Sequence, residues 1–201
     1  MNHYYSRDPT SSGKKTTIKT SAFGIPLIFK SQSGIFNWKK VDTGSEVLLH
    51  ATEIPSQPKL QILDLGCGYG YLGIALAKRY PEIKVVLADI NTIAVRMTRI
   101  NCEINNVKSN TEVYQSDLFE SLPHQLYDVI LSNPPIMAGK KTLRELINQS
   151  KTNLKANGSL QLVVPKKKGL TSIKDMITKT FGSYKVLEKQ SGYWILKAIN
   201  Y

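Results

Sequence analysis

The sequence has few of the residues that form disulfide bonds or bind metal ions in small proteins. Its 201 residues include only two cysteines, Cys67 and Cys102, which form no Cys-x-x-Cys pair. The three histidines, His3, His50 and His124, are scattered along the chain. Neither a disulfide framework nor a metal site is therefore expected. A chain of this length can fold without disulfide bonds or metal ions, because one domain of this size buries roughly 70% of the surface that its unfolded chain exposes.

Long apolar runs are also lacking. The first residues, MNHYYSRDPTSSGKK, are polar and contain no apolar segment of the kind found in secretory signals. No later stretch approaches the roughly 18 consecutive apolar residues of a membrane helix. We therefore expect a soluble cytoplasmic protein with no membrane partner, whose oligomeric state the sequence leaves open.

Acidic residues are scarce and unevenly placed. The chain has 27 Lys and Arg against 15 Asp and Glu, for a net charge of +12. Basic residues outnumber acidic ones eight to four in residues 1–60 and thirteen to three in residues 136–201, whereas residues 61–135 hold six against eight. A slightly acidic centre with basic ends suits a polyanion such as RNA, although solubility alone is an alternative explanation.

From residue 60 onward, short β-rich runs alternate with helical patterns, which predicts a doubly wound α/β fold with a mostly parallel, Rossmann-like sheet of seven strands. The expected strands are residues 60–65, 84–90, 111–115, 127–132, 159–165, 183–190 and 192–199. The expected helices are centred on residues 73–80, 94–105, 143–154 and 172–181. Ser191 and Gly192 mark a hairpin between the last two strands, so the last strand is expected to run antiparallel.

The sequence before residue 60 differs in character. Residues 16–38 indicate two or three short strands broken near Gly24 and Gly34, and VDTGSEVLLHA indicates a helix capped by Thr43 or Ser45. Three parts are expected: a flexible tail (1–14), a small N-terminal β extension (15–42) and the main domain (43–201).

A glycine-rich turn follows the first strand of the main domain. Gly68, Gly70 and Gly73 spell Gly-x-Gly-x-x-Gly between a strand and a helix, and Asp89 ends the next strand. This pattern is typical of dinucleotide sites, in which a pyrophosphate lies on the turn. One hypothesis is therefore that the chain is an NAD-dependent oxidoreductase.

Asp64 argues for a different ligand. It lies just before the glycines, where its carboxylate would repel a diphosphate. S-adenosylmethionine carries a cationic sulfonium and an ammonium, and the carboxylate would attract both. Gly66, Gly68 and Gly70 would let the backbone approach this ligand without a Cβ. The sequence therefore favours S-adenosylmethionine as the cofactor.

Two further acids complete a nucleoside site. Asp89 can accept both ribose hydroxyls, and the alternative is that it caps the helix beginning near Thr92. Asp117, in the run QSDLF, can accept from the adenine amine, and the alternative is that it caps the following turn. Cys67 is interpreted as a small turn residue and not as a nucleophile.

The fourth strand ends in SNPPI, residues 132–136. An Asn-Pro turn that ends the strand would explain the prolines. However, ligands of open α/β sheets lie beyond the carboxyl ends of the strands where the strand order reverses, so this segment should face the glycine turn. Asn133 and the Pro134 carbonyl can accept the two N–H groups of a planar amine and so aim its lone pair at a methyl donor.

These motifs match a known family. DLGCGYG, ADIN, SDLF, SNPPI and the upstream KVDTGSEVLL resemble the "methyltransferase small" family of class I S-adenosylmethionine-dependent enzymes, over roughly residues 34–198. The family includes ribosomal RNA guanine-N2 methyltransferases of the small subunit and single-domain archaeal relatives. The resemblance implies the class I methyltransferase fold and a catalytic set of Asn133, Pro134, Pro135 and Ile136. It implies cofactor contacts at Thr43, Gly44, Asp64, Gly66, Cys67, Gly68, Gly70, Asp89, Ile90, Asp117, Leu118 and Asn133.

The chain departs from the family pattern in two respects. Many amino-methyltransferases place an aromatic residue after Asn-Pro-Pro to stack on the target base, and this chain has Ile136. Another side chain would have to supply the stacking. Bacterial relatives also carry a second, degenerate domain that helps to dock RNA, and this chain is too short for one.

The motifs and the charge pattern predict an N-methyltransferase that acts on an exocyclic amine, with guanine N2 in ribosomal RNA as the first hypothesis. Lys140-Lys141 and Lys166-Lys167-Lys168 are candidate phosphate contacts, unless they are merely solvated. Two alternatives remain: methylation of a glutamine side-chain amide in a protein, and an RNA-binding ribosome assembly factor without catalysis.

Overall fold

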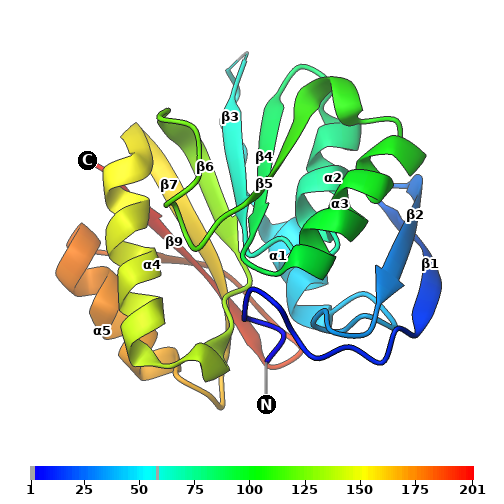
Figure 1. The fold of residues 1–201 in the computed structure, drawn as a ribbon. Helices are drawn as coiled ribbons and strands as arrows, with labels where there is room; N and C mark the ends of the chain where they lie inside the picture. Colours follow the sequence, from blue (N-terminus) through cyan, green and yellow to red (C-terminus); the bar gives the residue numbers. More distant parts are fainter. Residues whose placement is uncertain (1–2, 58) are drawn as a thin grey trace.

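A computed structural model describes residues 3–57 and 59–201 and contains a twisted sheet of seven strands with helices on both faces (Figure 1). The strands are β3 (Gln61–Leu65), β4 (Lys84–Asp89), β5 (Thr111–Gln115), β6 (Tyr127–Ser132), β7 (Leu154–Pro165), β8 (Lys185–Gln190) and β9 (Tyr193–Ile199). Their order is β5-β4-β3-β6-β7-β9-β8, and β9 is antiparallel to both of its neighbours. The predicted seven-stranded, mostly parallel sheet with an antiparallel last strand is confirmed.

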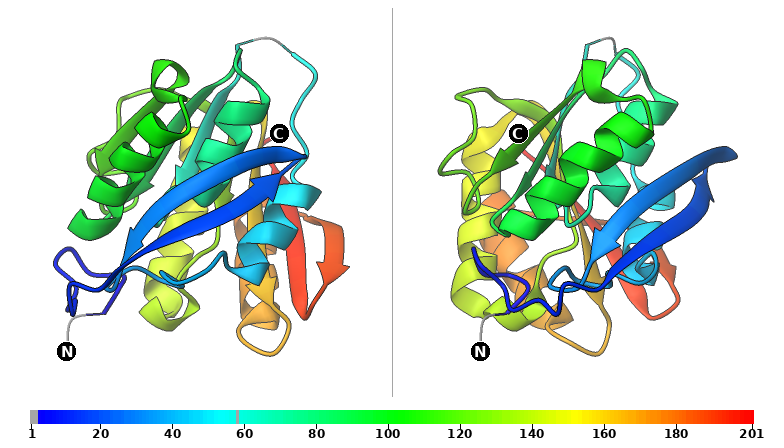
Figure 2. Two further views of the ribbon diagram at one scale, coloured as in Figure 1. Left: turned by 90° about the vertical axis from the view of Figure 1, so that its right-hand side faces the viewer. Right: turned by 45° about the vertical axis from the view of Figure 1, so that its right-hand side comes forward.

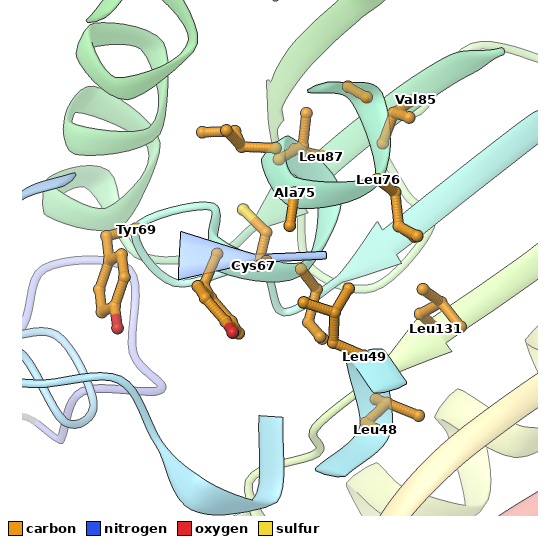
Figure 3. Close-up of a cluster of buried hydrophobic side chains, with 14 of the residues drawn as sticks. Leu48, Leu49, Cys67, Tyr69, Ala75, Leu76, Val85, Leu87 and Leu131 are labelled. Atoms are coloured by element: carbon orange, nitrogen blue, oxygen red, sulfur yellow. The ribbon is translucent and has the colours of Figure 1, made fainter. Parts of the chain in front are cut away.

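Each face of the sheet has its own hydrophobic core. Helices α1 (Thr43–Ala51), α2 (Tyr71–Arg79) and α3 (Thr92–Ile104) cover one face, and α4 (Lys140–Asn153) and α5 (Leu170–Phe181) cover the other. Ile62 of β3 lies in the first core and Leu63 in the second, since successive side chains of a strand point to opposite faces. Figure 3 shows part of the first core, with Leu48 of α1, Leu76 of α2 and Leu131 of β6.

The strand order reverses between β3 and β6. From β3 the chain builds outward through β4 and β5, and it then returns to β6 on the other side of β3. Asp64 of β3 is in register with Leu131 of β6. The glycine turn after β3 and the Asn133-Pro134 segment after β6 therefore leave the sheet side by side, as expected at such a switch point.

The N-terminal extension is one antiparallel hairpin, β1 (Lys15–Ala22) and β2 (Ile25–Gln32), that lies along α3 (Figure 2). Asn101 of α3 accepts from the Lys30 amide at 2.7 Å and donates to the Lys30 carbonyl at 2.9 Å. Asn105 forms the same pair of bonds with Ile28. Phe29 is fully buried in the first core, so hairpin and sheet share that core.

Helix α1 begins at an acidic cap. The side chain of Asp42 accepts from the Ser45 amide at 2.9 Å. The expectation that Thr43 or Ser45 caps this helix is therefore wrong, because the acceptor lies one residue before Thr43. Aspartate is among the preferred cap residues, so Asp42 satisfies one of the free amides of the first turn.

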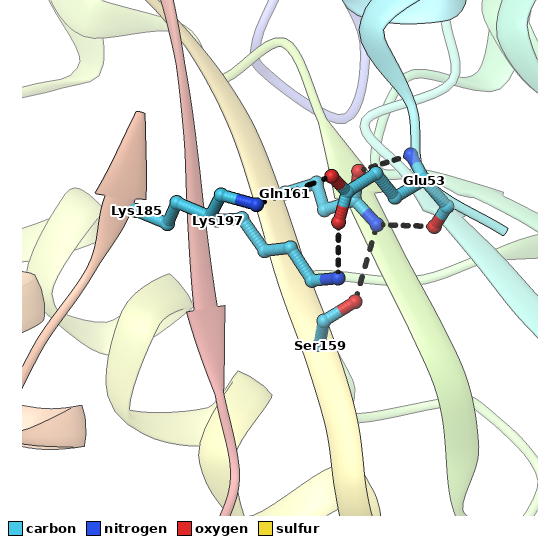
Figure 4. A network of polar contacts seen from close by, with 5 residues as sticks. All are labelled: Glu53, Ser159, Gln161, Lys185 and Lys197. Atoms are coloured by element: carbon cyan, nitrogen blue, oxygen red, sulfur yellow. Dashed lines mark hydrogen bonds and ion pairs between the residues drawn. The ribbon is translucent and has the colours of Figure 1, made fainter. Parts of the chain in front are cut away.

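The other end of α1 is fastened to the sheet through Glu53 (Figure 4). Gln161 of β7 accepts from the Glu53 amide at 3.0 Å and donates to the Glu53 carbonyl at 2.8 Å. The Glu53 carboxylate pairs with Lys197 at 2.7 Å and with Lys185 at 3.6 Å, and the hydrogen bond from Lys197 is the main reason that the pKa of Glu53 is lowered. Helix α1 is thus held at both ends.

Within residues 3–57 and 59–201, no helix has the length and the hydropathy needed to cross a membrane. The same residues contain no group of three or more His, Cys, Asp or Glu side chains that could hold a metal ion.

Candidate active site

A cavity of about 350 Å³ opens at the carboxyl ends of β3, β4 and β6. Its wall is formed by the glycine turn, by the segments that follow β4, β5 and β6, by the start of α1 and by two short stretches near the N-terminus. A cavity of this size is at the small end of the range for ligand sites. The segments predicted to face each other at the switch point do meet here.

The glycine turn is shaped by its backbone. The amides of Gly66 and Cys67 both donate to the Ala88 carbonyl, at 2.8 and 3.0 Å. Gly66 and Gly68 have φ values of +77° and +60°, which residues other than glycine rarely adopt. Among the described residues, a Cβ on Gly68 would come within 4 Å of Ile35 alone, at 3.7 Å, so there is room beside the cavity wall at this position.

Gly70 faces the protein interior and not the cavity, and its predicted cofactor contact stays a prediction. A Cβ on Gly70 would approach the Cδ1 of Ile74 to 2.8 Å and the Cγ2 of Thr98 to 3.1 Å, so it would point into the protein. Gly70 has a φ of +93° and precedes the first residue of α2. Among the described residues that line the cavity, Gly66 and Gly68 are present and Gly70 is not.

Asp64 is buried at the base of the cavity, with 1% of its surface exposed. Its Oδ2 accepts from the Gly73 amide at 2.9 Å, whereas its Oδ1 is buried without a hydrogen-bond partner among the described residues. Burial raises the pKa of Asp64 to about 7, the Gly73 hydrogen bond opposes this shift and the charge of Asp89 adds to it. A buried carboxylate oxygen without a partner is costly, so a cationic or donor group of a ligand would fit here.

Asp89 holds the glycine turn. Its Oδ2 accepts from the Gly68 amide at 2.8 Å and its Oδ1 from the Asn91 amide at 2.9 Å. Burial raises the pKa of Asp89 to about 6, against the effect of these hydrogen bonds. The cap of α3 is Asn91, whose Oδ1 accepts from the amides of Ile93 and Ala94. The alternative reading of Asp89 as that cap is therefore wrong.

The segment after β5 brings Asp117 and Leu118 to the cavity, which Ile90 also lines. The turn that follows is capped by Ser116, whose Oγ accepts from the Ser121 amide at 2.9 Å. The capping role weighed for Asp117 is thus filled by its neighbour, and the exposed Asp117 side chain lies at the cavity rim.

The side-chain amide of Asn133 is held through its nitrogen. Its Nδ2 donates to the Oδ2 of Asp42 at 2.8 Å and to the Oγ of Ser45 at 2.9 Å. A carboxylate only accepts, so it fixes which end of the amide faces Asp42. Both hydrogens of the NH₂ group have partners, and Asn133 lines the cavity. Its Oδ1 is therefore left to accept a hydrogen bond from another group.

Asp42 and Ser45 are site residues that the sequence reasoning missed. Asp42 is 8% exposed, and its Oδ1 accepts from Asn37 at 2.6 Å. The predicted contacts at Thr43 and Gly44 lie beside the site instead: neither lines the cavity in the described part of the chain. Thr43 is exposed, and a Cβ on Gly44 would stand 3.0 Å from the Oδ2 of Asp42. The signal for Asp42 was an acidic residue directly before a predicted helix.

The residues after Asn133 differ in whether they line the cavity. Pro134 and Pro135 line the cavity. Ile136 begins a short 3₁₀ helix (Ile136–Ala138) and packs against the second core, next to Gly169. Ile136 does not line the cavity in the described part of the chain, and its catalytic contact stays a prediction.

Cys67 lies in the cavity wall but is not poised to react. Burial raises the pKa of its thiol well above the ordinary value, and the negative charges of Asp89 and Asp64 add to the shift. A thiol held in its neutral form is a poor nucleophile, which agrees with the interpretation of Cys67 as a small turn residue.

The N-terminal segment, residues 3–12, reaches the cavity. Tyr4 and Tyr5 line it, and the Tyr4 and Arg7 carbonyls accept hydrogen bonds from Asn91 and Thr92. Nothing in the sequence pattern indicated this contact. The flexibility expected of residues 1–14 stays a prediction, as do the boundaries of the three parts, and residues 1–2 lie outside the described residues.

Comparison with known proteins places the chain among methyltransferases. The family model described as "Methyltransferase small domain" matches residues 26–197. The protein YbxB of Bacillus subtilis (strain 168) is 38% identical over 197 residues, which is 98% of this chain and 97% of YbxB. Ribosomal RNA small subunit methyltransferase C of Hamiltonella defensa is 33% identical over 173 residues, or 84% of this chain. The chain spans only 49% of that relative.

Solved structures share the fold. The Thermus thermophilus 16S rRNA N2 G1207 methyltransferase (RsmC), in complex with AdoMet and guanosine, has a TM-score of 0.82 at 24% identity, covering 96% of this chain and 52% of that one. A methyltransferase from Pyrococcus furiosus has a TM-score of 0.65 at 22% identity, covering 77% of this chain and 80% of the other. The Rossmann-like methyltransferase fold is thereby confirmed.

Proposed function

The chain belongs to the Methyltransferase small domain family, and from this premise we propose that it is an S-adenosylmethionine-dependent N-methyltransferase acting on guanine N2 in ribosomal RNA. The observation that carries the proposal is the arrangement of Asn133. Its amide nitrogen is occupied by Asp42 and Ser45, so its oxygen is an acceptor in the same cavity as the unpaired oxygen of Asp64.

The residues of the cavity fit the cofactor. When bound, S-adenosylmethionine supplies a methyl group on a positively charged sulfur. The buried Oδ1 of Asp64 is suited to a cationic group, and Gly66 and Gly68 present backbone without a Cβ. Asp89, Asp117, Ile90 and Leu118 line the same cavity. In this proposal Asp89 would accept from the ribose hydroxyls and Asp117 from the adenine amine, and Ile90 and Leu118 would contact the ring.

The same residues disfavour a dinucleotide. Asp64 and Asp89 both border the glycine turn, and the negative charge of Asp64 would oppose a pyrophosphate at that place. The amides of Gly68 and Gly73, which would otherwise be free to bind phosphate oxygens, donate to these two carboxylates. Calorimetry should therefore detect binding of S-adenosylmethionine and no binding of NAD.

Asn133 would orient the acceptor. The lone pair of an exocyclic amine on a purine is delocalised into the ring, so the nitrogen attacks poorly while it is planar. Acceptance of its hydrogens by the Oδ1 of Asn133 and the carbonyl of Pro134 would favour a pyramidal nitrogen with a directed lone pair. Orientation of this kind can lower a barrier by about 7–11 kcal/mol, so a strong general base is not needed.

The charge distribution supports an RNA substrate. The segment from residue 136 onward holds thirteen Lys and Arg against three acidic residues. Lys140-Lys141 begin α4 directly after the Asn133 segment, and Lys166-Lys167-Lys168 follow β7 at the same edge of the sheet; all five side chains are exposed. Exposed cations at the edge of the sheet where the cavity opens suit phosphate contacts that position an RNA strand.

Transfer of a labelled methyl group tests the proposal. The protein is incubated with labelled S-adenosylmethionine, ribosomal RNA and ribosomal proteins, and the two polymers are then separated. Label in RNA supports the proposal. Label only in protein would instead support the glutamine-amide alternative, and absence of label from both, with a cellular role that survives Asn133→Ala, would support a non-catalytic assembly factor.

A further inference from the structure

Asn133 can hold an amine, but a planar base also needs contacts on its faces. Ile136 does not line the cavity in the described part of the chain, and it packs against the second core. Tyr69 and Tyr71 line the cavity, yet each is only 5% exposed, and both rings contact Phe29 in the first core. The aromatic surface that remains at the cavity comes from the N-terminal segment and from Phe36.

The N-terminal segment is held by its backbone. The Nδ2 of Asn91 donates to the Tyr4 carbonyl at 2.9 Å, and the Thr92 amide donates to the Arg7 carbonyl at 3.0 Å. Figure 1 shows the segment, in dark blue, crossing beneath the carboxyl ends of the strands next to the start of α3. Because the carbonyls make these bonds, the side chains of Tyr4 and Tyr5 are free to line the cavity.

The rings form a cluster at the cavity. The centroid of the Tyr4 ring is 5.2 Å from that of Phe36 and 5.1 Å from that of Tyr5. The Tyr5 ring in turn stacks on His3, with centroids 4.9 Å apart. Phe36 lines the cavity and is 44% exposed, so part of its ring is accessible to a ligand. Half-buried aromatic faces of this kind are suited to a planar ligand.

Phe36, on which the Tyr4 ring packs, is followed by Asn37, whose Nδ2 donates to the Oδ1 of Asp42 at 2.6 Å. Burial is the main cause of the raised pKa of the Tyr4 hydroxyl, and the charges of Tyr5 and Asp42 add to it. Asp42 is the carboxylate that holds the Asn133 amide. The aromatic cluster and Asn133 therefore border the same cavity and are joined through Asn37 and Asp42.

We propose that Tyr4 and Phe36 form the surface on which the acceptor base stacks while Asn133 holds its amine. This inference rests on the proposed function and narrows its substrate to a base that has left the RNA stack, because a paired and stacked base could not offer a face to a side chain. A glutamine side-chain amide has no ring to stack and would gain little from this cluster.

Substitutions at the cluster test the inference. Tyr4→Ala and Phe36→Ala should raise the KM for ribosomal RNA by about five- to a hundredfold, the range expected from loss of one stacked base. Tyr4→Phe keeps the ring and should stay near the wild-type value. Tyr201→Ala, at a tyrosine that is 84% exposed, is the matched control and should have no effect. Thermal denaturation confirms that each variant is folded.

The affinity for the cofactor separates two roles. If the cluster binds the base, the dissociation constant for S-adenosylmethionine should change less than twofold in Tyr4→Ala. An unchanged KM for RNA, or a loss of cofactor affinity by the same factor as the KM rises, would overturn the inference, since the ring would then cover the cofactor or do nothing.

A binding experiment keeps the inference apart from the proposed function. If the wild-type protein transfers no methyl group to RNA, the proposed function fails. The cluster is then assessed by saturation-transfer NMR, with guanosine added to the complex with S-adenosylhomocysteine. Transfer to guanosine in the wild type that is lost in Tyr4→Ala supports the stacking role, and equal transfer in both proteins, or none in either, overturns it.

Discussion

The Nδ2 of Asn133 lies 2.8 Å from the Oδ2 of Asp42, across 91 residues of sequence. The same Asp42 oxygen accepts from the Ser45 amide and caps α1. A helix cap and the orientation of the proposed catalytic amide are therefore fixed by one carboxylate. Gln161 and Lys197 bind Glu53, just beyond the other end of α1. Since α1 is thereby anchored to the sheet, so is Asp42 at its start.

Substitution of Asp42 should lower turnover. Asp42→Asn presents an amide to Asn133 and removes the charged acceptor, so the Asn133 oxygen is no longer reliably turned to the cavity. A hydrogen bond to a charged group contributes roughly 1.5–3 kcal/mol, so kcat should fall by about ten- to a hundredfold. Steady-state kinetics with saturating cofactor measures this fall.

Asp42→Ser is the matched variant. Serine still caps a helix well, so α1 should keep its stability, whereas the carboxylate beside Asn133 is gone. We expect a lowered kcat with a melting temperature close to that of the wild type and an unchanged affinity for the cofactor. A kcat that follows the melting temperature across both variants would mean that Asp42 acts only on the fold.

The affinity for S-adenosylmethionine should fall as the pH falls. The pKa values of Asp64 and Asp89 are raised to about 7 and about 6, so both carboxylates gain protons between pH 8 and pH 5.5. A protonated Asp64 no longer attracts a sulfonium. S-adenosylhomocysteine, which lacks that charge, should lose less affinity over the same range when both ligands are titrated by calorimetry. Identical pH profiles for the two ligands would contradict the electrostatic role of Asp64.

Asp64→Asn should stabilise the protein without ligand, most strongly at high pH. The raised native pKa means that the folded state binds a proton more tightly than the unfolded state, so the contribution of Asp64 to stability falls as pH rises from about 4 to about 7. The advantage of the variant in urea denaturation should be about 2–3 kcal/mol larger at pH 8 than at pH 5. Saturating S-adenosylmethionine should raise the stability of the wild type more than that of the variant. An advantage that does not change with pH would show that Asp64 is not destabilised by burial.

Glu53→Gln should lower the free energy of unfolding at neutral pH and have less effect at low pH. The lowered pKa of Glu53 means that its contribution is present above the ordinary value of 4.5 and is lost as the pH falls through the native pKa. The side chain is 47% exposed, so solvent screening limits the loss at pH 7 to about 0.5–1 kcal/mol. Glu82→Gln is the control, because Glu82 is exposed and makes no ion pair in the described part of the chain. Equal losses for the two variants would mean that the Lys197 pair contributes nothing.

Most of the fold follows from local patterns. The alternation of apolar strands and amphipathic helices predicted β3, β4, β5 and β6 to within a residue or two, because buried parallel strands are continuous apolar runs. Strand β7 was predicted too short: it begins at Leu154 and not at residue 159. Asn157-Gly158 is typical of a turn, but here Asn157 takes a φ of +63° within the strand, and the pairing of β6 with β7 shifts register beside it.

The site was predicted as far as the sheet determines it. Asp64, Asp89 and Asn133 end strands whose carboxyl ends must meet, so topology alone brings them together. The partnership of Asn133 with Asp42 depends on how α1 packs, and no sequence spacing encodes it. The contribution of Tyr4 depends on backbone carbonyls that accept from Asn91 and Thr92, which any residue type could provide.

The directions of individual side chains were the hardest to predict. Gly70 and Ile136 both lie within the predicted motifs, yet a Cβ on Gly70 would point into the protein and the side chain of Ile136 packs against the second core. Which way a residue in a turn points is decided by one or two φ values, and these follow from packing that a local pattern does not contain.

Mass spectrometry of nucleosides from ribosomal RNA tests the central claim most directly. The RNA is incubated with S-adenosylmethionine bearing a deuterated methyl group and with either the wild-type protein or Asn133→Ala, after calorimetry has confirmed that both bind the cofactor. We predict N2-methylguanosine carrying the deuterated methyl group with the wild type, and at least a hundredfold less with Asn133→Ala. Equal labelling by both proteins, or a label on a different atom of the nucleoside, would contradict the account.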